Sequence, residues 1–348
     1  MYRDGRNYLV TGGAGFVGAH LTRRLLDLGH RVTVFDIASP AEPTTLNVLG
    51  LSNAVEYVTG DVRRQEDLHA LSGRGFAAAF HLAAQPISTL SNRFPQETRA
   101  VNIDGTRNVC AELGSETRIV FASSACSYGV PLPGASPLRE ETPLRQGFYV
   151  YTETKQRAED IVVNSASDAV IGRFVNIYGP GDRHFSRIIP RTIRQLSEGC
   201  EAALSRGNGS SVLDFLFITD AVDGFMRMAD LDMDLDLDGR GSRAGSERPV
   251  FNFGVGDGHA LPVRDLVRMI GSCFDGRERD PALPAAPAEP EMVKYLDPSK
   301  AMRRLGWKPK IRLPEGLRIT LEWYRANIHA MAPLEDEDLD AIANRRAA

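Results

Sequence analysis

Apolar and polar residues alternate in a regular order over the first half of the chain. Short runs rich in Val, Ile, Leu and Phe predict buried strands, and the longer segments between them carry apolar residues three and four apart, as amphipathic helices do. Strands that alternate with helices are typical of a parallel sheet covered on both faces. We therefore expect a doubly wound α/β fold whose strands are Tyr8–Thr11, Arg31–Asp36, Val55–Thr59, Ala78–Leu82, Arg118–Ala122 and Ala169–Phe174.

The pattern becomes irregular after Ile177. It still predicts strands at Leu213–Ile218 and Val250–Phe253 and helices at Ser186–Glu198, Asp220–Asp230, Leu261–Phe274, Pro298–Leu305 and Pro314–Ile328. The composition of residues 231–248 is typical of an exposed loop, and the prolines and alanines of residues 280–290 are typical of an extended linker.

The change of pattern also suggests a domain organisation. A chain of 348 residues is long enough for one large α/β domain or for two unequal lobes. We interpret residues 1–177 as one domain and residues 178–332 as a smaller C-terminal α/β substrate lobe, with a tail over residues 333–348. Some segments at about 212–255 could pack back on the first domain.

A glycine-rich turn follows the first predicted strand. Gly12, Gly15 and Gly18 are spaced as G-x-x-G-x-x-G, and an apolar helix pattern begins directly behind them. Residues without Cβ allow a tight turn, a close approach to a pyrophosphate and close packing of helix on strand, and the helix N-terminus offers N–H groups to phosphates. An ordinary strand-to-helix turn is the alternative. In this context the motif predicts a Rossmann-like dinucleotide site that includes Gly12, Gly15, Phe16 and Val17.

The second predicted strand ends in a carboxylate. Asp36 lies at about 20 residues past the turn, where an acid can bind both ribose hydroxyls of NAD. The same charge would repel a 2′-phosphate. The sequence therefore predicts NAD rather than NADP, unless a nearby arginine alters the choice.

Residues after the third and fourth strands are also predicted to contact the cofactor. Asp61 and Val62 suit the adenine edge, although Asp61 equally fits the N-cap of the next helix. We expect His81 to be a packed, hydrogen-bonded side chain and Asn102 to hold backbone groups together. The small residues that follow His81 leave room for a cofactor against the backbone, and the predicted contacts there are Leu82, Ala83 and Ala84.

A serine, a tyrosine and a lysine carry the predicted chemistry, and two neighbouring serines are candidates for the first. Ser123 and Ser124 end a strand, at the edge where ligands bind in open α/β sheets. Tyr151 and Lys155 are four residues apart, on one face of a predicted helix. An ammonium beside a phenol lowers the phenol pKa from about 10, so that the tyrosine can act as a base. A solvated helix face is the alternative for the Tyr–Lys pair by itself, but the nearby serine and the dinucleotide turn favour catalysis.

Composition narrows the class of protein. The net charge of −4 gives no reason to expect nucleic acid or an anionic membrane as a partner. The chain shows no apolar signal core and no run long enough to span a bilayer, so we expect a cytoplasmic protein. The four cysteines lack metal-ligand spacing, so we expect reduced thiols, no disulfide and no metal; they are Cys110, Cys126, Cys200 and Cys273.

Together these motifs resemble the extended short-chain dehydrogenase/reductase family, and within it the NAD-dependent nucleotide-sugar epimerases and dehydratases of the UDP-galactose 4-epimerase-like group. Matching segments extend to about Trp323. They are Thr11–Gly18, Gly60-Asp61, His81–Ala84, Ser123-Ser124 with Tyr128-Gly129, Tyr151 with Lys155, Arg173–Gly181, Asp297–Lys300 and Leu305–Pro309.

The resemblance implies roles for single residues. The family's catalytic serine or threonine lies four residues before the tyrosine of the Tyr-Gly pair, which gives Ser124, with Ser123 as second choice. Tyr151 would be the catalytic base and would contact the substrate. Lys155 would bind the nicotinamide ribose and tune the tyrosine, and Asn176 would approach the sugar or its diphosphate. Members of the family often form homodimers, which we also expect here.

The sequence departs from the family pattern at three places. Dehydratases usually carry Asp-Glu after the catalytic residue, where this chain has Ala125-Cys126, so the resemblance favours epimerisation. The arginines that usually hold the diphosphate are replaced by Leu213 and by the segment Ala288–Glu291. A diphosphate needs positive partners, and the candidates in this chain are Arg183, Arg187, Arg191 and Arg206.

We therefore expect an NAD-dependent epimerase of a nucleoside-diphosphate sugar, with carbon 4 as the inverted position by resemblance. The alternatives are a net dehydrogenase or reductase of a sugar or other secondary alcohol, and a sugar-nucleotide 4,6-dehydratase. A regulatory NAD-binding protein without activity is a further alternative, which Ser124, Tyr151 and Lys155 argue against because binding alone needs none of them.

Overall fold

The computed structural model describes residues 5–113, 117–166, 168–204, 207, 209–231, 249–284 and 291–330. The loop expected over residues 231–248 lies outside the described residues except for its first position. Most of the expected linker, the whole tail and Arg206 also lie outside the described residues.

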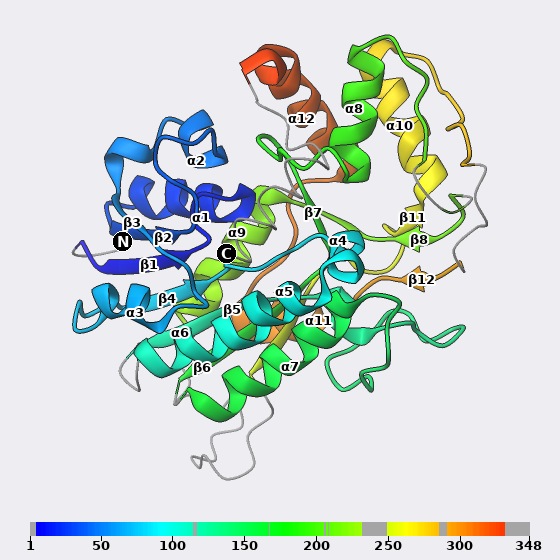
Figure 1. Cartoon of the computed structure of the whole chain (residues 1–348). Coiled ribbons are helices and arrows are strands. Elements are labelled where there is room, and N and C mark those ends of the chain that lie inside the picture. The colour runs from blue at the N-terminus through cyan, green and yellow to red at the C-terminus, as the bar shows by residue number, and fades with distance from the viewer. Residues whose placement is uncertain are drawn as a thin grey trace.

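The main sheet has seven strands in the order β10-β6-β5-β4-β1-β2-β3, and every neighbouring pair is parallel (Figure 1). The strand order reverses at β1, which places a ligand crevice at the carboxyl ends of the strands. The Rossmann-like prediction is confirmed. The strands are β1 (Asn7–Thr11), β2 (Arg31–Asp36), β3 (Glu56–Thr59), β4 (Ala78–His81), β5 (Arg118–Ser124), β6 (Ala169–Phe174) and β10 (Val250–Phe253).

Side chains that alternate along the strands supply two cores, one on each face of the sheet. Leu9 points into one core, while its neighbours Tyr8 and Val10 point into the other. The Leu9 core is covered by α3 (Gln65–Leu68), α6 (Gly105–Leu113) and α7 (Val150–Ser165). The opposite core is covered by α1 (Phe16–Asp27), α9 (Ile218–Ala229) and α11 (Ser299–Leu305).

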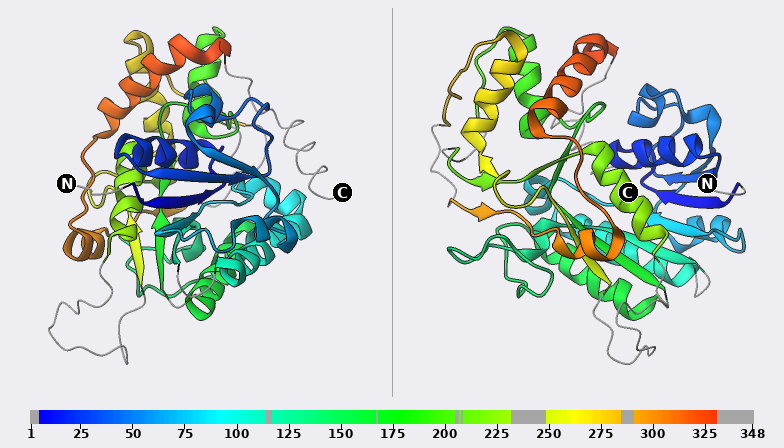
Figure 2. Two further views of the ribbon diagram at one scale, coloured as in Figure 1. Left: turned by 90° about the vertical axis from the view of Figure 1, so that its left-hand side faces the viewer. Right: turned by 180° about the vertical axis from the view of Figure 1, so that it is seen from behind.

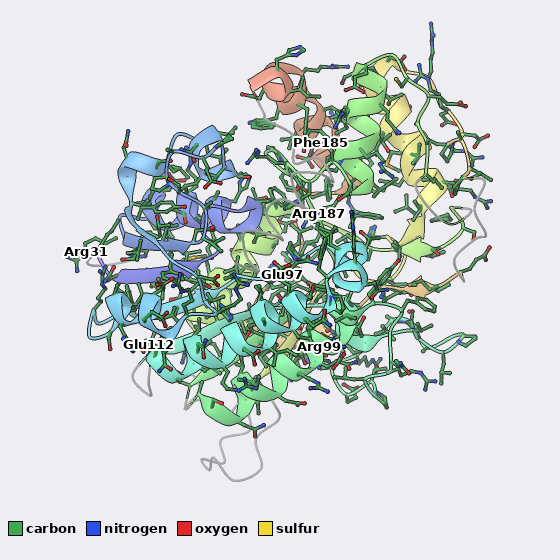
Figure 3. The ribbon with its side chains drawn as sticks, in the orientation of Figure 1. Arg31, Glu97, Arg99, Glu112, Phe185 and Arg187 are labelled. Atoms are coloured by element: carbon green, nitrogen blue, oxygen red, sulfur yellow. The ribbon has the colours of Figure 1, made fainter. Side chains whose placement is uncertain are left out.

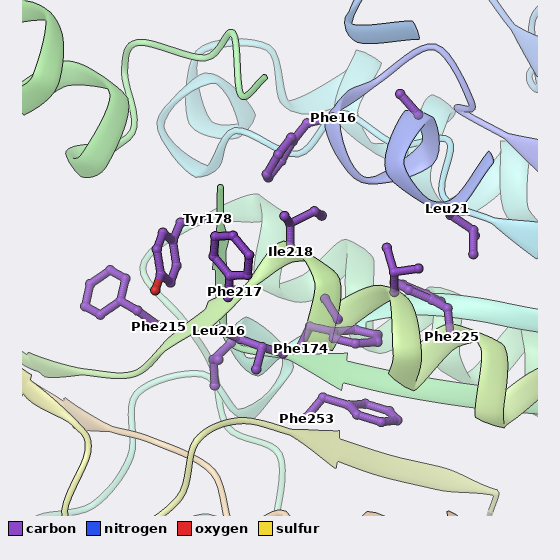
Figure 4. Packing of buried hydrophobic residues seen from close by; sticks show 14 of the residues in the cluster. Phe16, Leu21, Phe174, Tyr178, Phe215, Leu216, Phe217, Ile218, Phe225 and Phe253 are labelled. Atoms are coloured by element: carbon purple, nitrogen blue, oxygen red, sulfur yellow. The ribbon is translucent and has the colours of Figure 1, made fainter. Parts of the chain in front are cut away.

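Aromatic packing joins the later segments to the main sheet. The ring of Phe174 stacks on Phe225 at 4.4 Å and on Phe253 at 4.5 Å between centroids (Figure 4). Trp307 packs its edge against Phe253 and donates its indole N–H to the carbonyl oxygen of Asp220 at 2.9 Å. Such pairs contribute about 0.5–1.5 kcal/mol each beyond their buried area. They anchor β10, α9 and α11 on β6.

The remaining elements lie beyond the carboxyl edge of the sheet. The helices α8 (Ile188–Ser197) and α12 (Leu313–Asn327) both pack on α10 (Val263–Asp275), as Figures 1 and 2 show. Short strands accompany them: β7 (Asn176–Tyr178) with β9 (Phe215–Phe217), and β8 (Val212–Leu213) between β11 (Leu261–Pro262) and β12 (Val293–Lys294). The division into two domains at residue 177 stays an interpretation.

One predicted strand is divided in the structure. The segment expected as Leu213–Ile218 forms β8 and β9, and Asp214 separates them. Asp214 is fully buried, and its carboxylate accepts a hydrogen bond of 2.9 Å from the backbone N–H of Val255. A buried carboxylate needs such donors, so the side chain takes a position that the strand pattern cannot accommodate.

Candidate active site

A cavity of about 340 Å³ lies at the carboxyl ends of the central strands. The small helices after β4, which are α4 (Ser88–Arg93) and α5 (Pro95–Arg99), contribute part of its wall. Ten residues predicted from the sequence to contact the cofactor line it together: Gly12, Gly15, Phe16, Val17, Asp36, Asp61, Val62, Leu82, Ala83 and Ala84. Tyr151 and Lys155, also predicted to contact the cofactor, are not among the residues that line it.

Two glycines of the glycine-rich motif leave no room for a side chain. Gly12 has a φ of +70°, and a Cβ on it would lie 2.7 Å from the backbone nitrogen of Ala83. A Cβ on Gly18 would lie 2.3 Å from the carbonyl oxygen of Gly12. The helix α1 begins after Gly15, and no side chain caps its N-terminus. The turn therefore fits a pyrophosphate, which can accept the N–H groups that start α1.

Asp36 is the last residue of β2, and each oxygen of its carboxylate accepts a hydrogen bond from a backbone N–H group. One oxygen accepts the N–H of Ala14 and the other accepts the N–H of Ala38, both at 3.0 Å. The carboxylate therefore lies beside the glycine-rich turn, on the wall of the cavity. A negative group at this place fits a ribose diol and disfavours a phosphate there.

Asp61 does not cap the next helix. The helix α3 begins at Gln65 with Arg64 as its N-cap residue, so the N-cap alternative is wrong. The carboxylate of Asp61 instead accepts the backbone N–H of Arg63 at 2.9 Å and pairs with the guanidinium of Arg63. This local turn keeps Asp61 on the cavity wall.

His81 and Asn102 have the structural roles expected of them. His81 is buried between the hydroxyls of Thr11 and Thr106, at 2.8 and 3.0 Å, and burial lowers its pKa to about 3. Asn102 accepts the N–H of Gln85 at 2.8 Å and donates to Thr154 in α7 at 3.1 Å. Asn102 therefore ties the loop after β4 to the helix that carries Tyr151.

The structure brings Ser124, Tyr151 and Lys155 together. Ser124 is the last residue of β5 and Tyr151 lies near the start of α7, and the side chain of Ser124 is close enough to the phenol to lower its pKa. The hydroxyl of Ser124 also accepts the backbone N–H of Cys126 at 3.1 Å. The ammonium of Lys155 lies 5.8 Å from the centre of the Tyr151 ring. A phenol, a hydroxyl and an ammonium in this arrangement can share and move a proton.

Burial dominates the electrostatics of this group. It raises the pKa of Tyr151 above the ordinary value for a phenol; Cys126 raises it further, whereas the charge of Arg187 and the side chain of Ser124 lower it. Burial lowers the pKa of Lys155 to about 8, against the carboxylate of Glu159 and the thiol of Cys126, which raise it. Burial therefore favours the neutral phenol of Tyr151, and nearby positive charge has to offset it for the tyrosine to act as a base.

The two predicted substrate residues outside this group differ in position. Arg187 lines the cavity, and its guanidinium donates to the carboxylate of buried Asp182 at 2.9 Å. Figure 3 labels it near the middle of the view, together with Glu97, which lines the same cavity. Asn176 is exposed, donates to the carbonyl oxygen of Asp214 at 3.0 Å and does not line this cavity.

The sequence did not single out three residues of the site. The carboxylate of Asp182 pairs with the guanidinium of Arg187. Cys126 raises the pKa of both Tyr151 and Lys155. Glu159, one turn further along α7, raises the pKa of Lys155. The position of Cys126 two residues after Ser124 was a usable signal. The spacing of Glu159 four residues after Lys155 was another.

Within the described ranges, no group of three or more His, Cys, Asp or Glu side chains could hold a metal ion. None of the helices in those ranges is long and apolar enough to cross a bilayer. The four cysteines all carry free thiols.

Known proteins share this sequence pattern and fold. Residues 8–235 match the family described as the NAD dependent epimerase/dehydratase family. The UDP-glucose 4-epimerase of Mycolicibacterium smegmatis is 28% identical, over 91% of this chain and 98% of its own length. UDP-glucuronate 4-epimerase 4 of Arabidopsis thaliana is also 28% identical, over 92% of this chain and 76% of its own length.

A solved structure with the same fold contains the expected cofactor. The dTDP-glucose 4,6-dehydratase DesIV from Streptomyces venezuelae, solved with NAD bound, superposes with a TM-score of 0.77. It is 25% identical and covers 94% of this chain and 100% of its own. Epimerases and dehydratases are therefore both among the relatives.

Proposed function

This chain belongs to the NAD dependent epimerase/dehydratase family, and we propose that it is an epimerase that inverts carbon 4 of a nucleoside-diphosphate sugar. NAD is its cofactor, as the family and the glycine-rich cavity indicate. The observation that carries the proposal is the meeting of Ser124, Tyr151 and Lys155, in which the ammonium of Lys155 lies 5.8 Å from the centre of the Tyr151 ring.

Each of these side chains has a step to perform. Ser124 holds the oxygen on carbon 4 of the sugar, and Tyr151 takes the proton from that oxygen. The ammonium of Lys155 favours the phenolate form of Tyr151. NAD held by Gly12, Gly15 and Asp36 would supply the acceptor for the hydride of carbon 4 and the donor for its return. If the keto sugar turns over in the site before the hydride returns, the hydride adds to the opposite face of carbon 4. Tyr151 then gives its proton back to the oxygen on carbon 4, and the configuration of that carbon is inverted. The cycle then leaves no free NADH.

The residues after Ser124 support epimerisation over dehydration. Loss of water needs one group to take a proton from carbon 5 and another to protonate the leaving hydroxyl. Ala125 offers neither, and Cys126 offers a single thiol where dehydratases of the resembling family usually carry two carboxylates.

Arg187 supports a second candidate substrate, a nucleotide sugar that carries a carboxylate on carbon 5. The diphosphate is attached to carbon 1, across the sugar ring from the carbon on which Tyr151 acts. The charge of Arg187 acts on Tyr151, so we place this residue on the side of the sugar that carries carbons 4 and 5 rather than carbon 1. A guanidinium suits a carboxylate better than a neutral hydroxymethyl group. The UDP-glucuronate 4-epimerases among the relatives agree with this choice.

The experiment for the main proposal uses NAD-loaded protein and UDP-, GDP-, CDP-, dTDP- and ADP-sugars. Stabilisation against heat identifies the nucleotide that binds, and NMR identifies the product. An epimer without build-up of NADH supports the proposal. Stoichiometric NADH would indicate the dehydrogenase, and a 4-keto-6-deoxy sugar would indicate the dehydratase.

Assembly and location are proposals as well. We expect a homodimer in the cytoplasm, with a nucleotide sugar as the small-molecule partner and with neither nucleic acid nor membrane as a partner. The mass of the NAD-loaded protein from solution scattering tests the assembly, and a monomeric mass would contradict it.

A further inference from the structure

A buried ion pair lies directly behind the proposed catalytic group. Glu159 in α7 and Arg173 in β6 have side chains that are 6% and 5% exposed. The Nε of Arg173 donates to both carboxylate oxygens, at 3.0 and 3.2 Å, and a terminal nitrogen donates to one of them at 2.6 Å. Buried ion pairs are costly to desolvate and are weak evidence for stability. The pair therefore calls for a role besides holding the fold.

The carboxylate of this pair reaches the strand that carries the serine. Ser123 donates its hydroxyl to Glu159 and lies 3.0 Å from the hydroxyl of Ser127. Ser123 immediately precedes Ser124, so Glu159 fixes the end of β5 against α7, the helix that carries Tyr151.

The guanidinium of the pair is held from the other side. It lies over the ring of Tyr128 at 4.7 Å and donates to the carbonyl oxygen of Glu140 at 3.4 Å. The hydroxyl of Tyr128 donates to Asn252 in β10 at 2.8 Å. These contacts keep Arg173 in place, so the carboxylate of Glu159 has little freedom to leave Ser123.

The charged and titratable groups around Lys155 come from three elements. Tyr151 and Glu159 share its helix, Cys126 belongs to the turn after β5, and neutral His81 belongs to β4. Glu159 itself faces Arg173, with Tyr128 and Glu140 behind that residue. Among these groups, Glu159 opposes most strongly the effect of burial on Lys155.

We propose that Glu159 is a positioning residue that holds the Ser123-Ser124 end of β5 against α7 and presents its carboxylate to Lys155 from one helical turn away. Arg173 and Ser123 fix the carboxylate for both tasks. The inference rests on the proposed function, since it assigns Glu159 a part in preparing Tyr151 as a base.

The test removes the charge and follows the pH dependence of turnover. Glu159→Gln alone leaves Arg173 buried without a counterion and can prevent folding, so the Glu159→Gln/Arg173→Met double variant is measured beside it. We expect the alkaline limb of kcat to move down by about one pH unit in the double variant, because Lys155 then loses its proton more easily.

A matched control lies on the same helix. Glu153 pairs with Arg99 at 2.9 Å, but the two side chains are 36% and 40% exposed (Arg99 is labelled in Figure 3). The Glu153→Gln/Arg99→Met variant removes the same two charges from α7 and a neighbouring helix. We expect it to leave the alkaline limb in place.

A second readout does not depend on the sugar. The phenolate of Tyr151 absorbs in the near ultraviolet. Its titration is obtained by subtracting, at each pH, the absorbance of the NAD-loaded protein with Tyr151→Phe from that of the same NAD-loaded protein with Tyr151. The positive nicotinamide ring of bound NAD would lower the pKa of Tyr151 into the range where Lys155 still carries its proton. We therefore expect Tyr151 to ionise at higher pH in the Glu159→Gln/Arg173→Met variant than in the natural protein. If this variant folds, binds NAD and shows both pH dependences unchanged, the inference is overturned. A uniform loss of kcat with unchanged pH dependences would show a merely structural role and would overturn it too. If no sugar nucleotide is turned over, the proposed function fails. The titration of Tyr151 alone then tests whether Glu159 is a positioning residue.

Discussion

The ammonium of Lys155 donates a 2.8 Å hydrogen bond to the backbone carbonyl oxygen of Ala122, two residues before Ser124. This contact joins α7 to the end of β5, so the helix that carries Tyr151 and the strand that carries Ser124 share a fixed point. Only 4% of Lys155 is exposed, and its charge is therefore little screened by solvent.

This buried ammonium predicts an alkaline limit to activity. The pKa of Lys155 is lowered to about 8, so below that pH the ammonium is present and favours the phenolate of Tyr151. As pH rises through this value the charge is lost, and kcat should fall. The pH profile of kcat measured with saturating sugar nucleotide tests this. Constant kcat well above pH 8 would contradict the role given to Lys155.

Removal of the proposed base should abolish turnover but not cofactor binding. Tyr151→Phe keeps the ring in its buried place and deletes only the hydroxyl. General acid–base catalysis contributes about 10²- to 10⁴-fold, so we expect kcat to fall within that range. Bound NAD, measured after release from the denatured protein, should stay at the natural level. Unchanged turnover would contradict this role and would mean that the activity does not involve Tyr151.

Asp36 should decide between the two nicotinamide cofactors. Asp36→Asn keeps the size of the side chain and removes the charge beside the ribose. We expect NAD affinity to fall by about 10-fold or more, because a hydrogen bond to a charged group contributes about 1.5–3 kcal/mol. NADP affinity should rise relative to NAD. Calorimetric titration of cofactor-free protein measures both, and an unchanged ratio would mean that another residue selects the cofactor.

Much of the cofactor site could be predicted from the sequence because its residues are local to strand ends. The bounds of β2 agree with the pattern, and Gly12 and Asp36 follow from strand, turn and helix signals in one short segment. By contrast, β5 continues past Ala122 because Ser123 and Ser124 pair with Arg173 and Phe174 of β6. That pairing joins distant parts of the chain, and the apolar pattern ends before it.

The surroundings of the catalytic group were harder to predict for the same reason. The contact between Ser123, Glu159 and Arg173 forms only when β5, β6 and α7 meet. Local spacing shows that Glu159 follows Lys155 by one helical turn, but it does not show that an arginine from β6 lies against it. Likewise, Arg187 was a candidate for binding the substrate, but the carboxylate of Asp182 that orients it became visible only in the structure.

Arg187 should distinguish acidic from neutral sugars. Arg187→Met keeps much of the length of the side chain and removes its charge. If the substrate carries a carboxylate, KM for that sugar nucleotide should rise by about 10-fold or more, as for loss of a charged hydrogen bond. The KM of a neutral sugar nucleotide should change little. Equal losses for both substrates would mean that Arg187 binds a group common to both, such as the diphosphate. Arg191→Met serves as the control, since Arg191 does not line the cavity.

The most direct test of the central claim follows one hydrogen atom. The NAD-loaded protein is given a nucleotide sugar with deuterium on carbon 4, and the product is examined by NMR. The account predicts an epimer that keeps the deuterium on carbon 4, because the hydride leaves that carbon and returns to its other face. Deuterium on carbon 6 of a keto sugar would show dehydration, and deuterium in released NADH would show net oxidation. Either result would contradict epimerisation.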